Sequence, residues 1–139
     1  MGLHLRERAL KLAMRAAKYI DARQPDPAEL GSAAIRRILV VSCTAIGDTL
    51  MSTPAIRSLR LRYPHAHLSL VIHPAYRPLF AGLPGVDAMF GYAGKWQGFI
   101  RLARTLRRQQ FDLAVILHGN EPQATPLAYL SGARWIFKL

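Results

Sequence analysis

A single carboxylate stands where an apolar segment gives way to a helical pattern. Residues 37–42, "RILVVS", are mostly apolar, and Asp48 follows them after the loop "CTAIG". A carboxylate can take a proton from a hydroxyl group within hydrogen-bond reach, so Asp48 is a candidate general base. The alternative is that Asp48 is the N-cap of the helix, where it would accept bonds from free backbone N–H groups and contribute about 1 kcal/mol. The local pattern favours capping, and the two roles can coexist.

Small and polar residues near Asp48 are further candidates for contacts with a ligand. Thr44 and Thr49 carry hydroxyl groups, and Gly47 allows a tight turn or the close approach of a ligand. The loop resembles a phosphate-binding turn but has neither the GxGxxG nor the GxxxxGK[ST] pattern. His118 and Asn120 follow the apolar run "LAVIL" and form a second candidate group. For His118, the alternative is a loop residue that caps the next helix.

The elements that must position these residues alternate along the chain. Apolar runs predict strands over 37–42, 66–73, 86–92, 111–119 and from 134, and the periodicity predicts helices over 49–62, 96–110 and 121–133. This alternation is typical of an α/β fold, a doubly wound and mostly parallel sheet. Ligands of such folds bind outside the carboxyl ends of the strands. We therefore expect the loops after residues 42 and 117 to face one crevice.

Two of the predicted helices carry basic side chains on one face. The pattern of the helix over 96–110 points a set of apolar residues inward and its arginines outward. The inward set is Trp96, Phe99, Ile100, Ala103 and Leu106. The arginines of the helices, at 57, 60 and 62 and at 101, 104, 107 and 108, are expected on solvated outer faces. The alternative is that they attract anionic headgroups or phosphates.

The first 34 residues are predicted to lie outside the main domain. Residues 3–23 have the period of an amphipathic helix with one basic face, and a linker rich in Pro and Gly follows. The predicted domains are therefore residues 1–34 and residues 35–139. The helix either contacts a membrane surface or packs against folded protein, and its alanine-rich apolar face favours neither.

Composition limits the class of partner. The formal net charge is +11, from 19 Lys and Arg against 8 Asp and Glu, which suggests nucleic acid, a phosphorylated substrate or an acidic membrane surface. Nucleic acid is the least favoured, because the aromatic residues are not interleaved with the basic ones. No apolar run approaches the roughly 18 residues of a membrane-spanning helix. Cys43 is the one cysteine, which excludes an internal disulfide, and the histidines have no metal-ligand spacing.

An ordered set of short motifs resembles glycosyltransferase family 9, the ADP-heptose:lipopolysaccharide heptosyltransferases. The set begins with the apolar strand, the Ser/Thr-containing loop and the pair Gly47-Asp48. It continues with Leu50, Pro54, Leu59-Arg60, Tyr63-Pro64, "GLPGVDAMFGY" and "FDLAVILHGN". The resemblance covers about residues 36–139. One departure is that many relatives carry a basic residue where Ser42 or Cys43 stands, so a phosphate contact at that point is not expected here.

The resemblance implies a fold, a reaction and a location. The fold would be the Rossmann-like, N-terminal half of a two-domain GT-B glycosyltransferase, with the donor-binding domain absent and the chain inactive alone. Asp48 would be the base of an inverting transfer from a nucleotide diphosphate sugar, such as ADP-heptose, to a lipopolysaccharide-core acceptor. No metal or other cofactor is implied. The location would be cytoplasmic, or peripheral on the inner face of the bacterial inner membrane. The alternative is a non-catalytic, anion-binding or membrane-peripheral Rossmann module.

Overall fold

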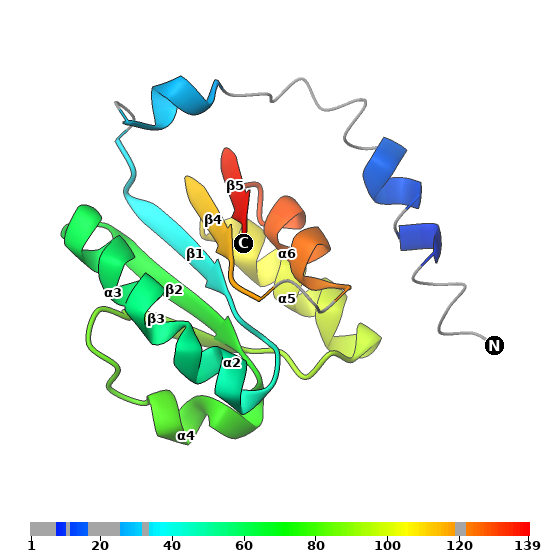
Figure 1. The fold of residues 1–139 in the computed structure, drawn as a ribbon. Coiled ribbons are helices and arrows are strands. Elements are labelled where there is room, and N and C mark those ends of the chain that lie inside the picture. Colours follow the sequence, from blue (N-terminus) through cyan, green and yellow to red (C-terminus); the bar gives the residue numbers. More distant parts are fainter. Residues whose placement is uncertain (1–7, 11, 17–25, 32–33, 119–121) are drawn as a thin grey trace. The chain divides into compact units, whose positions relative to one another are not determined.

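The structure, a computed structural model, describes residues 8–10, 12–16, 26–31, 34–118 and 122–139 (Figure 1). The chain divides into two units, Met1–Ser32 and Ala33–Leu139, and each is described by itself. In the first unit residues 8–10 and 12–16 are helical, as predicted, and a 3-10 helix, η1, spans Pro27–Gly31. The remaining residues of the predicted helix over 3–23 lie outside the described part of the chain. No helix in the described residues has the length and apolarity needed to cross a membrane.

The second unit contains a five-stranded parallel sheet, which confirms the predicted α/β class. The strands are β1 (Arg37–Val41), β2 (His67–Ile72), β3 (Ala88–Gly91), β4 (Leu113–Ile116) and β5 (Trp135–Lys138). Their order across the sheet is β3-β2-β1-β4-β5, and every neighbouring pair is parallel. Leu39, Val40 and Val41 of the central strand are fully buried, as expected for a strand covered on both faces.

Helices cover both faces of this sheet. They are α2 (Ile46–Met51), α3 (Thr53–Arg62), α4 (Arg77–Phe80), α5 (Trp96–Arg108) and α6 (Ala124–Leu130), with a 3-10 helix, η2, at Pro74–Tyr76. Figure 1 shows α2, α3 and α4 on one face and α5 and α6 on the other. This arrangement follows from right-handed crossovers, because those that lead to β2 and β3 cross the sheet in one direction and those that lead to β4 and β5 cross it in the other. Among the largest fully buried side chains are Phe80, Phe99 and Leu127, which come from helices of both faces.

The single helix predicted over 49–62 is in fact two helices. The first begins at Ile46, three residues early, and ends at Met51, and Ser52 separates it from α3. The cause is Pro54, which has no N–H to donate to the carbonyl oxygen of Leu50. The hydroxyl of Thr53 donates to that oxygen instead, at 2.8 Å. The break therefore comes from proline chemistry, and it makes α2 a separate short element that carries Asp48.

One prediction for α5 is wrong. Ile100 was expected to point inward, but its side chain is 50% exposed, while Leu102 is buried. A helix advances about 100° per residue, so the buried positions Phe99, Leu102 and Leu106 define a face that leaves Ile100 on its margin. Ile100 instead shares the outer side of the helix with arginines.

Arg60 is not on a solvated face, contrary to the prediction. Its Nη1 donates to the carbonyl oxygens of Pro64 (3.0 Å) and Ala66 (2.7 Å). Its Nε and Nη2 both donate to the carbonyl oxygen of Gly85, at 3.2 and 2.9 Å, and Nη2 forms an ion pair with Asp87. The side chain thus ties α3 to the turn before β2 and to the turn before β3.

Asp87 makes the stability of this cluster depend on pH. Burial raises the pKa of its carboxyl, but the hydrogen bond from the N–H of Leu68 and the hydrogen bond and charge of Arg60 outweigh burial, so the pKa lies below its ordinary 3.8. A carboxyl with a lowered folded-state pKa stabilises the fold above its unfolded pKa, and the contribution is lost as the pH falls through the folded value.

We therefore expect the difference in unfolding free energy between the native chain and Asp87→Asn to shrink as the pH falls below 3.8. Urea unfolding followed by circular dichroism at a series of pH values measures it. A difference that stays constant through this range would contradict the assignment.

Candidate functional site at the carboxyl ends of strands β1 and β4

The loops that follow β1 and β4 leave the sheet side by side. The N–H of Ser42 donates to the carbonyl oxygen of Val71 (2.9 Å), and the N–H of Leu117 donates to that of Val41 (2.9 Å). These bonds continue the ladders one residue past the strands. The prediction that the loops bearing Asp48 and His118 share one edge of the sheet is therefore confirmed, and this edge is where ligands bind in such folds.

Hydroxyl groups fasten α2 to the end of β1. The hydroxyls of Ser42 and Ser52 are 3.0 Å apart, and Ser52 also donates to the carbonyl oxygen of Asp48 at 3.0 Å. The hydroxyl of Thr49 donates to the carbonyl oxygen of Ala45 at 3.1 Å. All these bonds hold the backbone on both sides of Asp48, so they fix the place from which its carboxylate extends.

Asp48 is not the N-cap of its helix. The N-cap of α2 is Ala45, and Asp48 is the third helical residue, in the first turn. The capping alternative is therefore wrong, because the helix begins before the loop reaches Asp48. The Asp48 side chain is half-buried, and its carboxylate makes no hydrogen bond or ion pair with any residue that the structure describes.

The other described acids of this unit are used differently. The carboxylate of Asp112 accepts bonds from the N–H groups of Arg36 (2.8 Å) and Arg37 (2.9 Å), and that of Asp87 accepts from the N–H of Leu68 (2.7 Å). Both lie at the amino ends of strands, where they fasten the backbone. Asp48 alone among these three lies at the carboxyl ends and has no partner within the described structure. Its carboxylate is the one left available to a ligand.

Gly47 does not form a tight turn, contrary to the sequence interpretation. It is the second residue of α2, and its φ is not in the left-handed region. A Cβ built on Gly47 would have no atom within 4 Å, so the fold does not require a glycine there. The remaining interpretation is that the missing side chain leaves room for a ligand beside Asp48.

Gly47→Ala separates these two interpretations. Alanine costs about 0.5–1 kcal/mol less than glycine inside a helix, and the site is open, so we expect the variant to be more stable by about that amount. If a ligand approaches Gly47, the same variant should bind that ligand more weakly. Thermal unfolding measures the first effect, and ligand titrations measure the second. Higher stability with unchanged ligand affinity would remove Gly47 from the site.

The two threonines differ in their surroundings. Thr49 is fully buried and its hydroxyl bonds to the backbone, so the geometry supports a structural role for this predicted ligand contact. Thr44 is 9% exposed, and its hydroxyl has no hydrogen-bond partner in the part of the chain that the structure describes. Buried polar atoms almost always have partners in native proteins. Thr44 thus retains hydrogen-bonding capacity for a ligand.

His118 is the second residue after β4 and has a φ of 55°, in the left-handed region. A residue other than glycine rarely adopts this conformation, and such residues gather at functional sites. His118 does not cap the next helix, because α6 begins at Ala124 with Gln123 as N-cap. The predicted contact Asn120 lies outside the described residues.

The sequence interpretation missed Gln123. This residue is 5% exposed, and its side-chain Oε1 is buried without a hydrogen-bond partner among the described residues. It stands at the start of α6, on the edge where β4 ends. The sequence did contain a signal for Gln123, because it is a polar residue near the start of the helix that follows the strand ending at this edge. Among the described residues, no group of three or more His, Cys, Asp and Glu could hold a metal ion.

Known proteins with sequences similar to this chain are heptosyltransferases. The chain is 30% identical to lipopolysaccharide heptosyltransferase 3 of Escherichia coli K12 over 78 residues, which are 51% of this chain and 23% of that protein. It is 30% identical to lipopolysaccharide heptosyltransferase 2 of the same strain over 89 residues, 60% of this chain and 26% of that protein. No model of a protein family matches.

Solved structures are similar to a larger part of this chain than the sequence matches cover. A glycosyl transferase family 9 protein of Veillonella parvula DSM 2008 has a TM-score of 0.67 at 26% identity, over 73% of this chain and 31% of its own. E. coli ADP-heptose lipopolysaccharide heptosyltransferase II has a TM-score of 0.64 at 25% identity, over 73% and 30%. The resemblance to family 9 and its heptosyltransferases is thereby confirmed over this part of the chain. The chain spans about a quarter of the length of the curated relatives it matches.

Proposed function

We propose that this chain is the acceptor-side part of a glycosyltransferase of the heptosyltransferase type. The observation that carries the proposal is the environment of Asp48: a half-buried carboxylate at the carboxyl edge of the sheet, with its backbone fixed on both sides and no partner among the described residues. The similarity to heptosyltransferases supports sugar transfer in lipopolysaccharide synthesis as the reaction class.

In the proposed reaction Asp48 acts as general base. A hydroxyl oxygen of the acceptor sugar attacks the anomeric carbon of the donor, and Asp48 takes the proton from that hydroxyl. The bond between the anomeric carbon and the diphosphate breaks, and the nucleotide diphosphate leaves with the electron pair. One displacement from the opposite side inverts the configuration at the anomeric carbon. Gly47 gives the acceptor room, and Thr44 and His118 hydrogen-bond its hydroxyl or phosphate groups.

The partners follow from the same proposal. The acceptor is a lipopolysaccharide-core sugar, and the donor is a nucleotide diphosphate sugar. ADP-heptose is favoured as the donor because one similar protein is the E. coli ADP-heptose lipopolysaccharide heptosyltransferase II. The donor is bound by a second domain, without which the chain does not turn over. Neither a metal nor another cofactor takes part. We propose the cytoplasmic face of the bacterial inner membrane as the place of this reaction.

The test joins this chain to a donor-binding domain taken from a similar heptosyltransferase. Transfer from ADP-heptose to a lipopolysaccharide acceptor that lacks its heptose residues is measured by release of ADP. We expect transfer with the joined protein and none with either part alone. If the joined protein is folded, binds ADP-heptose and still gives no product, the chain is better described as a non-catalytic, anion-binding module.

A further inference from the structure

Helix α5 carries a basic stripe beside an exposed apolar side chain. Arg101, Arg104, Arg107 and Arg108 are all exposed, as the sequence predicted, and Ile100 is 50% exposed. At about 100° per residue these five side chains occupy one third of the helix circumference, next to the buried face. The stripe therefore combines positive charge with apolar surface along one side of a helix of 13 residues.

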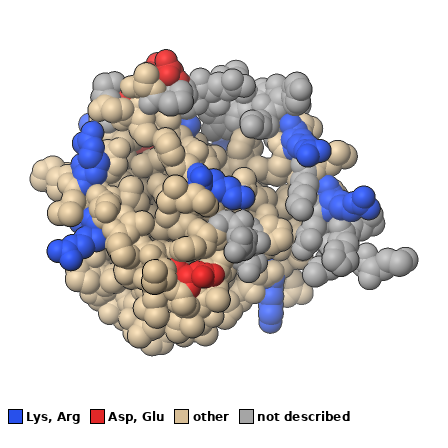
Figure 2. All heavy atoms as spheres, viewed as in Figure 1, with Lys and Arg blue, Asp and Glu red and all other residues tan. Residues whose placement is uncertain are grey.

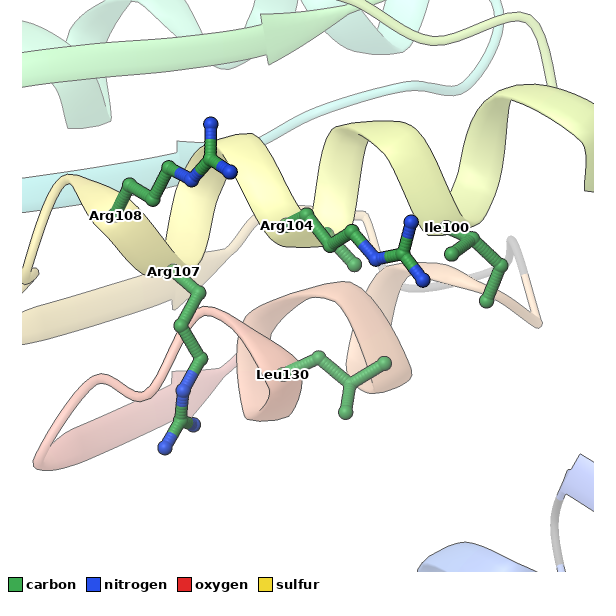
Figure 3. A pocket seen from close by; sticks show the side chains of 6 residues that line it. Ile100, Arg104, Arg107, Arg108 and Leu130 are labelled. Atoms are coloured by element: carbon green, nitrogen blue, oxygen red, sulfur yellow. The ribbon is translucent and has the colours of Figure 1, made fainter.

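Part of this stripe lines a groove between α5 and α6. The groove has a volume of about 400 Å³ and is lined by Ile100, Ala103, Arg104, Arg107, Arg108 and Leu130. Figure 3 shows Arg107 extending from α5 toward α6, Arg104 running along α5, and Arg108 leaving the helix on the other side. The apolar lining comes from both helices. Arginine side chains thus flank an apolar groove that is open to solvent.

No described acid compensates these arginines. The lining of the groove contains no Asp or Glu, and Arg104, Arg107 and Arg108 have no ion pair or hydrogen bond with a described residue. Asp112 borders a neighbouring hollow that Arg107 also lines, but its carboxylate accepts bonds from the backbone of Arg36 and Arg37. Figure 2 shows how little acidic surface accompanies the basic side chains on the face in view.

The residues that line the groove favour an anionic bilayer over nucleic acid as the partner. Single-stranded nucleic acids stack their bases on aromatic side chains, and no aromatic residue lines this groove. An anionic bilayer instead presents phosphates directly beside apolar chains. Arginine keeps its head at the phosphates while its stem lies on apolar surface. In the groove, guanidinium groups likewise lie beside the apolar side chains of Ile100 and Leu130, as phosphates lie beside acyl chains in a bilayer.

We propose that the α5–α6 groove docks this chain on an anionic phospholipid bilayer, with the arginines at the lipid phosphates and Ile100 among the upper acyl chains. This proposal does not depend on the sugar-transfer reaction, since the groove contains none of the residues placed at the carboxyl edge of the sheet.

The test measures binding of the 139-residue chain to phosphatidylcholine vesicles with and without phosphatidylglycerol. The groove variant R104Q/R107Q/R108Q is compared with R57Q/R62Q/R77Q, which removes the same charge from exposed arginines of α3 and α4. Each arginine near an anionic membrane contributes roughly fivefold in affinity, so the groove variant should bind on the order of 100-fold more weakly. The control variant should stay within about threefold of the native chain.

Further variants test whether charge is sufficient and which surface contacts the membrane. R104K/R107K/R108K retains the charge and should bind almost as well as the native chain. The emission of Ile100→Trp should shift to the blue on anionic vesicles, while that of Leu79→Trp, at a 58% exposed position on α4, should not. Thermal unfolding shows that each variant is folded. Raising the salt from about 0.1 M to about 1 M should release the chain, since the Debye length falls from about 10 Å to about 3 Å.

Three results would overturn the proposal. The first is absence of binding by the native chain to anionic vesicles, and the second is equal loss in the groove and control variants, which would reflect net charge alone. The third is tighter binding of a single-stranded oligonucleotide than of vesicles, lost in the groove variant, which would make the groove a nucleic-acid surface.

Discussion

Asp48→Asn should slow the proposed sugar transfer strongly while leaving the fold intact. In the protein joined to a donor-binding domain we expect kcat to fall by about 10²- to 10⁴-fold, because asparagine cannot take the proton of the attacking hydroxyl. The unfolding free energy should change by no more than about 0.5 kcal/mol, since the carboxylate has no partner among the described residues. ADP release under saturating donor and acceptor, together with thermal unfolding, measures both quantities.

Asp112→Asn provides the matched control for this effect. It also removes one acidic charge, but from a residue that fastens the amino end of β1. We expect it to lower stability and to leave kcat within a few-fold of the native value. If Asp48→Asn keeps native turnover, or if the two variants lose turnover equally, Asp48 is not the base.

Arg60→Met should destabilise the fold more than replacement of an exposed helix arginine usually does. Methionine keeps the apolar stem but leaves the carbonyl oxygens of Pro64, Ala66 and Gly85 without their donor. The ion pair with Asp87 is partly exposed and adds little. We expect a loss of about 2–4 kcal/mol, which urea unfolding measures. Lysine has a single charged nitrogen and cannot serve these acceptors together, so Arg60→Lys should lose a large part of the same energy.

Arg57→Met tests whether this loss is specific. Arg57 lies one helical turn earlier on α3, is exposed and makes no bond to a described residue. Its replacement should change the unfolding free energy by no more than about 0.5 kcal/mol. Equal effects of the Arg57 and Arg60 variants would mean that the cluster around Gly85 contributes nothing to stability.

The parallel sheet was predictable because its signal is local. A strand covered on both faces needs continuous apolar residues, and "ILVV" and "LAVI" have that composition. Alternation with helical periods then implies right-handed crossovers, and these bring the carboxyl ends of β1 and β4 to one edge. The neighbourhood of Asp48 and His118 followed from the order of the elements, so the sequence sufficed to locate the candidate site.

The helix boundaries around the site were less predictable. A helix can begin wherever backbone N–H groups find solvent or a cap, so "TAIGD" did not reveal that α2 starts at Ile46. That start excludes the N-cap role of Asp48 and removes the turn assigned to Gly47. The buried position of Thr49 also depends on where the helix starts, because a helix sets the direction of each side chain by its distance from the first turn.

Three features could be predicted from residues that lie close together in the chain: the α/β class, the edge of the sheet that carries Asp48, and the basic outer face of α5. Which charged groups have partners depends instead on contacts between distant segments. Arg60 meets Gly85 and Asp87 because the turn before β3 returns to α3, and the arginines of α5 meet no described acid because α6 offers Leu130 there. Charges on a helix look alike in sequence, and distant segments determine which are neutralised and which remain available for binding.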